Sequence, residues 1–218
     1  MVVAGGTGTR FGRPKQFLEL AGRPVIAWSV QAARSVASGV VVVVPAGGDP
    51  DGSGAVTTDD AWGADLVVAG GDSRSASVRA GLAAVPEEAA VIVIHDAARP
   101  LAPPSLFEAV VAAVVSGGAD GAIPVVPVSD TVKRVTDGVV TATVDRAGMV
   151  TVQTPQAFVA STLRAAHAAG GEATDDAGLL EARGATVRTV PGVPTNLKLT
   201  YPEDLTVAEA LLPSGAVS

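Results

Sequence analysis

Short runs of apolar, mostly β-branched residues alternate along the chain with stretches in which apolar residues recur at helical spacing. Val40–Val44 and Val91–Ile94 are apolar throughout, as is typical of parallel strands that are covered on both faces. The other strands expected from the pattern are Val2–Ala4, Leu66–Ala69, Gly121–Val126, Val150–Gln153 and Thr186–Val190. The alternation predicts an α/β fold with a mostly parallel sheet and helices on both of its faces.

Four amphipathic helices are expected because apolar residues gather on one face of each segment. These faces are formed by Ile26, Val30, Ala33 and Ala37, by Val78, Leu82 and Val85, by Leu106, Val110 and Val114, and by Leu205, Ala208 and Leu212. Thr200-Tyr201-Pro202-Glu203 has the pattern of a capping box, which would open the last helix.

The segment Pro127–Gly148 interrupts this alternation. Its two β-branched runs, Val132–Val135 and Val139–Val144, flank Asp137-Gly138, a dipeptide typical of tight hairpin turns. A two-stranded ribbon is only marginally stable alone, so we expect another surface to cover it. The prediction is one domain over residues 1–218 with a projecting hairpin arm at 127–148.

Composition and charge narrow the range of functions. The chain has no cysteine, which excludes thiol catalysis and thiolate metal sites. Fifteen basic and 22 acidic residues give a formal net charge of −7, so we expect no nucleic-acid partner. No apolar run reaches the ~18 residues of a membrane span, and the first residues do not resemble an export signal. We therefore expect no membrane association and a cytoplasmic location.

Two glycine-rich segments follow expected strands. Ala4–Arg10 contains Gly5, Gly6 and Gly8, and Gly70–Ser77 contains Gly71 and Asp72. Glycines let backbone N–H groups approach phosphate oxygens, and Arg10 with the nearby Lys15 would offset the negative charge. The spacing matches neither the dinucleotide-binding fingerprint nor the P-loop. An ordinary turn, and a helix start capped by Asp72 or Ser73, are the alternatives.

Asp96 is the candidate metal ligand. It belongs to His95-Asp96-Ala97-Ala98-Arg99-Pro100, directly after the apolar run Val91–Ile94. Ligands of open α/β sheets bind beyond the carboxyl ends of the strands, and Mg²⁺ prefers carboxylate and phosphate oxygens. The alternative is a structural ion pair between Asp96 and Arg99. His95 has no second histidine near it in the sequence, so we interpret it as a packing or hydrogen-bonding residue.

These segments, in their order along nearly the whole chain, resemble the 2-C-methyl-D-erythritol 4-phosphate cytidylyltransferase family of the non-mevalonate isoprenoid pathway. All three lysines of the chain, Lys15, Lys133 and Lys198, lie within them. The segments that carry the resemblance are Ala4–Arg10, Pro14–Gln16, Gly70–Ser77, His95–Pro100, Asp130–Lys133, Val144–Arg146, Thr154–Gln156, Thr174–Ala177, Asn196–Thr200 and Pro202–Leu205.

The resemblance implies a Rossmann-like nucleotidyltransferase fold of three layers and a homodimer joined through the arm. It also implies transfer of a cytidylyl group from CTP to the methylerythritol phosphate, with release of pyrophosphate and with Mg²⁺ held by Asp96. On the same ground, the residues expected to act in catalysis are Arg10, Lys15, Arg146 and Lys198. Those expected to bind the nucleotide are Ala4, Gly5, Gly6, Gly8, Gly71, Asp72 and Ser77, and those expected to bind the second substrate are Arg99, Thr131 and Thr174.

Two other functions fit many of the same motifs. One is a cytidylyltransferase for another polyol phosphate, such as ribitol 5-phosphate, because the Ala-Gly-Gly opening also occurs in such enzymes. The other is a nucleotide sensor without catalytic activity. His95–Pro100 and Asp130–Lys133 favour the methylerythritol enzymes, and the presence of Arg10, Lys15, Asp96 and Lys198 together argues against a sensor.

Overall fold

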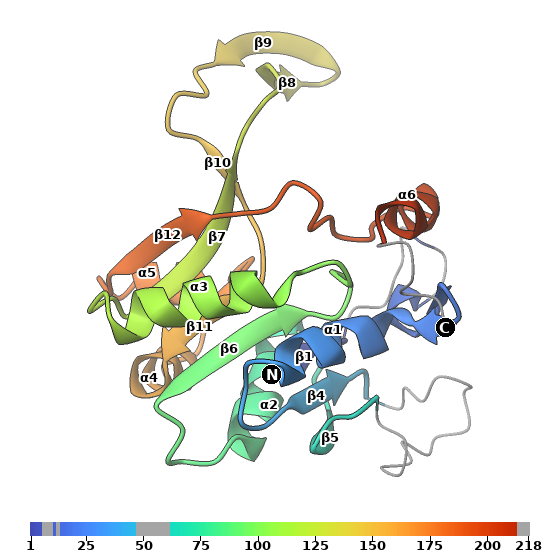
Figure 1. Ribbon diagram of the computed structural model, residues 1–218. Coiled ribbons are helices and arrows are strands. Elements are labelled where there is room, and N and C mark those ends of the chain that lie inside the picture. The colour runs from blue at the N-terminus through green and yellow to red at the C-terminus, as the bar shows by residue number, and fades with distance from the viewer. Residues whose placement is uncertain (6–10, 12–13, 47–61, 213–218) are drawn as a thin grey trace.

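A computed structural model describes residues 1–5, 11, 14–46 and 62–212. Within this part of the chain, the central sheet has eight strands, and helices lie on both of its faces (Figure 1). The strand order is β10-β7-β11-β6-β1-β4-β5, and β12 pairs with β7 beside this path. The described residues contain no helix that is both long and apolar enough to cross a membrane.

The sheet is mostly parallel, as predicted. Four neighbouring strands form its parallel half, namely β1 (Val2–Val3), β4 (Val41–Val44), β5 (Leu66–Ala69) and β6 (Val91–Asp96). β7 (Gly121–Pro127) and β12 (Val187–Pro191) run in the same direction, whereas β10 (Val150–Val152) and β11 (Gln156–Val159) run against it. The carboxyl ends of β1, β4, β5 and β6 therefore meet at one edge.

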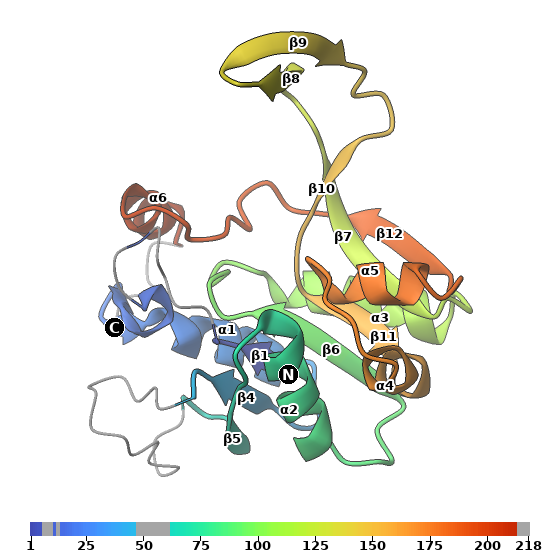
Figure 2. The same ribbon diagram turned by 180° about the vertical axis from the view of Figure 1, so that it is seen from behind.

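Helices complete the outer layers. α1 (Val25–Arg34) and α3 (Pro104–Val115) cover one face, whereas α2 (Arg74–Ala84), α4 (Ala160–Ala168) and α5 (Asp176–Glu181) cover the other (Figures 1 and 2). On β4, Val42 and Val44 pack into the cluster with α1, and Val43 packs into the cluster with α2. Successive residues of β4 are thus buried on opposite faces, which explains why this strand is wholly apolar.

Shorter elements connect these layers. η1 (Lys15–Phe17), β2 (Glu19–Leu20) and β3 (Arg23–Pro24) precede α1. The last helix, α6 (Glu203–Leu211), packs Leu205 and Ala208 against a small cluster that contains Leu20 and Leu199. This cluster holds the segment before α6 against the body of the protein.

The predicted hairpin is confirmed. β8 (Val132–Thr136) and β9 (Val139–Val144) pair only with each other among the described strands and project from β7 and β10 (Figure 1). Asp137 and Gly138 have φ angles of 48° and 78°, the positive values that a tight hairpin turn of this type requires. On the arm, Val139 and Val140 are 64% and 57% exposed.

The prediction of a capping box before α6 is wrong. The residue before the helix is Pro202, and no side chain caps the helix there. Instead, the carboxylate of Asp204 accepts hydrogen bonds from the backbone N–H groups of Thr200 at 2.6 Å and Tyr201 at 2.8 Å. The carboxylate that turns back is thus one position later than the capping-box pattern requires.

Candidate active site

Ala4 and Gly5, the first residues of one glycine-rich segment, lie near the other glycine-rich segment and Asp96 at the carboxyl edge of the sheet. In the register of β1, Val3 lies opposite Val43 of β4 and opposite Asp96 of β6. The backbone N–H of Ala4 donates to the carbonyl of Val43 at 2.7 Å, and Ala97 donates to Val3 at 3.0 Å. Ala4 and the following Gly5 are therefore placed between the end of β4 and the Asp96 carboxylate.

Ser77 of α2 lies where the two glycine-rich segments approach each other. Its buried Oγ is 3.2 Å from both the backbone nitrogen and the carbonyl oxygen of Gly71. A Cβ at Gly5 would lie 2.9 Å from this oxygen, so a side chain there would displace it. Glycine thus permits the close approach of two loop backbones, whose N–H groups are suited to phosphate oxygens.

The start of α2 is capped as one of the alternatives predicted. Ser73 is the N-cap residue, and its Oγ accepts a hydrogen bond from the Ala76 N–H at 3.1 Å. Asp72 is exposed beside it. Ser73 caps the helix, and the side chain of Asp72 stays at the surface. The cap therefore leaves Asp72 available for the nucleotide-binding role expected of this loop.

We expect Gly70→Ala to destabilise the protein. A Cβ at this position would lie 2.6 Å from Ser77 Oγ and 3.1 Å from the carbonyl oxygen of Val44. Overpacking of this kind costs about 1–3 kcal/mol in the free energy of unfolding, which urea denaturation would measure. Gly39→Ala is the control, because its nearest new contact would be at 3.7 Å. Equal losses in the two variants would contradict the close approach at Gly70.

Asp96 pairs with Lys198 rather than with Arg99. Lys198 Nζ lies 2.6 Å from Asp96 Oδ2, and the Lys198 and Asp96 side chains are 44% and 15% exposed, respectively. Burial alone would raise the pKa of Asp96, but the charge and hydrogen bond of Lys198, with smaller contributions from Arg74 and Arg99, lower the pKa below its ordinary value. Asp96 is therefore a carboxylate near neutral pH, at the point where a cationic or metal-bound ligand would meet the sheet.

A buried polar network holds Lys198 in this place. The side-chain Nδ2 of Asn196 donates to the carbonyl of Thr154 at 2.9 Å, and the carbonyl of Asn196 accepts from Arg99 Nη1 at 2.7 Å. The backbone N–H of Leu199 donates to Ala98 at 2.9 Å. The segment on both sides of Lys198 is thus tied to the turn after β6. Arg99, expected to bind the second substrate, also forms part of this framework.

The segment that contains Thr174 lies beside the start of α2. Arg74 Nη2 is 2.6 Å from Asp176 Oδ2, and Ser73 Oγ donates to Glu172 at 2.8 Å. Asp175 caps α5 by accepting from the Gly178 N–H at 3.0 Å. Thr174 itself is exposed. The Arg74–Asp176 pair was not predicted, because nothing in the two separate segments indicates that they meet.

The remaining predicted site residues fall into three groups. Lys15 lies in η1 next to Gln16, whose Nε2 donates to the Ala4 carbonyl at 2.7 Å, so η1 lies against the end of β1. Arg10, Gly6 and Gly8 lie outside the described residues. Thr131 and Arg146 are exposed at the base of the arm, where the Arg146 guanidinium contacts the Ser129 carbonyl.

Asp96 fits a magnesium site in which the substrate provides some of the metal ligands. The described residues contain no group of three or more His, Cys, Asp or Glu side chains that would hold a metal by themselves. Mg²⁺ in nucleotide-dependent enzymes is commonly bound by one or two carboxylates together with substrate phosphates and water. One ionised carboxylate next to glycine-lined loops matches this chemistry.

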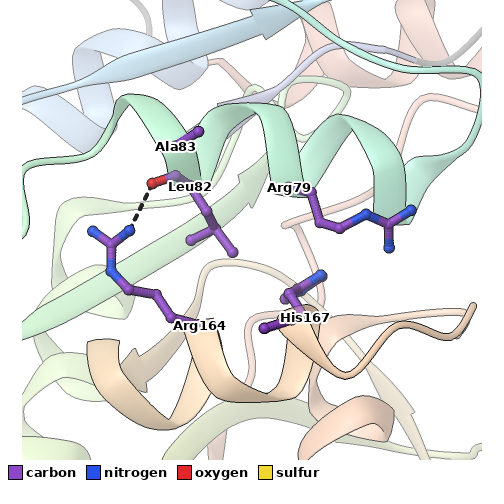
Figure 3. Close-up of a pocket in the computed structure, with 6 residues that line it drawn as sticks. Arg79, Leu82, Ala83, Arg164 and His167 are labelled. Atoms are coloured by element: carbon purple, nitrogen blue, oxygen red, sulfur yellow. Dashed lines mark hydrogen bonds between the residues drawn. The ribbon is translucent and has the colours of Figure 1, made fainter.

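A separate hollow of about 230 Å³ lies between α2 and α4, lined by Arg79, Leu82, Ala83, Arg164, His167 and Ala168. In it, Arg164 donates to the Leu82 carbonyl at 2.8 Å and to the Val85 carbonyl at 2.9 Å, near the end of α2 (Figure 3). The guanidinium groups of Arg79 and Arg164 point away from each other. This arrangement serves helix packing and does not form a convergent anion site.

Known proteins resemble the chain over nearly its full length. A family model for 2-C-methyl-D-erythritol 4-phosphate cytidylyltransferase matches residues 1–214. The enzymes of that name from Nocardia farcinica and Rubrobacter xylanophilus are 44% and 47% identical to it; the alignments cover 97% of this chain and 92% and 93% of theirs. The crystal structure of the enzyme from Thermus thermophilus matches with a TM-score of 0.79 and 35% identity, over 96% of both chains. This chain therefore belongs to the 2-C-methyl-D-erythritol 4-phosphate cytidylyltransferase family.

Proposed function

We propose that the site at the carboxyl edge of the sheet transfers the cytidylyl group of CTP to 2-C-methyl-D-erythritol 4-phosphate. The products are 4-diphosphocytidyl-2-C-methyl-D-erythritol and pyrophosphate, and the reaction belongs to isoprenoid biosynthesis. The observation that supports this most directly is the Lys198–Asp96 pair, which lies at the same edge as the glycine-lined loops. It provides a cation and a metal-binding carboxylate where two phosphorylated substrates would meet.

In the proposed reaction, a phosphate oxygen of the methylerythritol phosphate attacks the α-phosphorus of CTP. A new P–O bond forms, the bond between the α-phosphorus and the bridging oxygen breaks, and pyrophosphate leaves. The attacking monoester is already anionic near neutral pH, so no protein nucleophile is needed. The protein must align two polyanions and offset their charge, which is the role we give to Lys15, Lys198 and Arg10.

The same geometry supports the proposed nucleotide and metal roles. Backbone N–H groups around Gly5 and Gly71 would hold the phosphates of CTP, with Ser77 fixing the distance between the loops. Asp96 would hold Mg²⁺, which when bound neutralises charge on the triphosphate. Arg99 and Thr174 border the same edge and would contact the second substrate.

Asp96→Asn is expected to raise the Mg²⁺ concentration that gives half-maximal activity by more than about tenfold, because loss of a group that only orients a metal ligand already costs about 10–100-fold in metal affinity. The substitution keeps the shape of the side chain and removes its charge. A Mg²⁺ titration at saturating CTP measures the change. Glu87→Gln, which removes an exposed carboxylate away from the sheet edge, is the matched control. An unchanged titration would remove Asp96 from the metal site.

We also propose a homodimer joined through the arm. The exposed valines of β8 and β9 need a covering surface, and a closed two-fold dimer provides one reciprocally. In such a dimer, Thr131 and Arg146 at the base of the arm would contribute to the site of the partner. The absence of nucleic-acid and membrane partners and the cytoplasmic location stay predictions from the sequence.

The direct test is pyrophosphate release from CTP in the presence of different polyol phosphates. We expect release with 2-C-methyl-D-erythritol 4-phosphate and Mg²⁺, and little with ribitol 5-phosphate. Turnover with ribitol 5-phosphate alone would favour the other polyol-phosphate enzyme. CTP binding without turnover of any polyol phosphate would favour the nucleotide sensor.

A further inference from the structure

The turn after β6 is held by a buried histidine that has no assigned part in the reaction. His95 is completely buried and packs on Phe107 of α3, with 5.0 Å between the ring centroids. Its Nε2 lies 3.1 Å from the Arg99 carbonyl, and its Nδ1 lies 3.1 Å from Thr154 Oγ1. Both ring nitrogens therefore have a hydrogen-bond partner within the protein, and neither depends on water.

The direction of each hydrogen bond follows from the chemistry of the partners. The Arg99 carbonyl can only accept, so His95 Nε2 carries the proton and Nδ1 of the neutral ring accepts from the Thr154 hydroxyl. The Thr154 oxygen in turn accepts from the backbone N–H of Asp96 at 3.0 Å.

These bonds hold the two ends of one short turn. Thr154 binds the backbone of Asp96 where the turn begins, and His95 binds the carbonyl of Arg99 where it ends. The turn is closed by the Arg99 N–H, which donates to the Asp96 carbonyl at 3.0 Å. Within this turn, the Asp96 side chain forms an ion pair with Lys198, and the Arg99 side chain donates a hydrogen bond to the Asn196 carbonyl. A displacement of the turn would move both contacts together.

We propose that His95 is a positioning residue, which acts with Thr154 to fix the turn 96–99 and thereby sets where the Asp96 carboxylate meets Lys198 and metal-bound nucleotide. This inference rests on the proposed role of Asp96. All of the observed bonds require a proton on Nε2 of His95. Because its side chain is buried against α3, His95 acts through the backbone of the turn and through Thr154.

The matched pair Thr154→Val and Thr154→Ser tests the proposal. Valine has nearly the shape of threonine but removes the hydroxyl, so Asp96 N–H and His95 Nδ1 lose their shared partner; serine keeps it. We expect Thr154→Val to lower kcat and to raise the half-saturating Mg²⁺ concentration, each by about tenfold, as for other groups that orient metal ligands. Thr154→Ser should stay close to the wild-type enzyme. Equal impairment of both variants, or a normal kcat and Mg²⁺ titration for folded Thr154→Val, would overturn the proposal.

A second measurement does not depend on turnover or on a variant at Thr154. The chain has two histidines, so ¹⁵N NMR of the imidazole rings gives two sets of signals, and a His167→Gln variant assigns the remaining set to His95. We expect a protonated Nε2 for His95, because the Arg99 carbonyl can only accept. A ring protonated at Nδ1 alone would overturn the proposal. If the wild-type enzyme shows no cytidylyl transfer, the proposed function fails, whereas the NMR result still decides the state of His95.

Discussion

Lys198→Met is expected to lower kcat by roughly 10²–10³, the usual loss when one preorganised electrostatic donor is removed from a transition state. Methionine keeps much of the length and the apolar stem of lysine, so the substitution removes mainly the charge next to Asp96. The reaction brings together two polyanions. Water cannot replace a cation held in a fixed position between them, because water molecules must reorient to stabilise the same charge. Steady-state kinetics with saturating CTP and polyol phosphate measure the effect.

The stability of this variant separates a catalytic role from a structural one. The Lys198 side chain is 44% exposed but its partner Asp96 is only 15% exposed, so the variant leaves a largely buried carboxylate with the smaller contributions of Arg74 and Arg99. We therefore expect a fall of about 1–3 kcal/mol in the free energy of unfolding and a folded protein at assay temperature. Arg183→Met, which removes an exposed cation near the end of α5, controls for the change in net charge. A large fall in melting temperature with a normal kcat would assign Lys198 to the framework instead.

The features that make up the candidate site can be predicted because they depend on local patterns. A wholly apolar run followed by His95-Asp96 predicts a buried strand with a carboxylate at its carboxyl end, and the structure extends β6 to Asp96. Glycine-rich segments after β1 and β5 predict the loops at the same edge. The strict alternation of strands and helices was sufficient to place these three features together without knowledge of any contact between them.

The partners of the site residues were not predictable in the same way. Asp96 and Lys198 are 102 residues apart, and His95 and Thr154 are 59 apart. His95 and Asn196 both contact Thr154, just before β11, and the hydrophobic pattern does not predict β11 as a strand. β11 has four residues, begins with the buried Gln156 and lies antiparallel between β6 and β7. A short run of this type carries too little periodicity to be distinguished from a loop or a helix start.

The polar network around Lys198 was not predictable either, because its members are far apart in the sequence. Gln153, Thr154 and Asn196 are buried and hydrogen-bonded to one another, but each stands in the sequence among residues that would equally suit an exposed turn. Buried polar side chains become informative only when their partners are known, because burial without partners would be costly. The structure thus adds the framework that holds Asp96 and Lys198, whereas the sequence indicated the reacting edge itself.

Mixing two inactive variants should restore activity if the arm completes the site of the partner. In Lys198→Met the body of the site is damaged, and in Arg146→Ala the arm is damaged. A mixed dimer then has one intact site and one site with both lesions. Random exchange makes half of the dimers mixed, so about a quarter of the wild-type activity should return under closed two-fold symmetry.

The assay is pyrophosphate release after exchange, with exchange itself verified by mass spectrometry of differently tagged subunits. Each variant incubated alone is the control. If Arg146 acts within its own chain, every site keeps at least one lesion, and verified exchange without recovery would contradict the arrangement in trans.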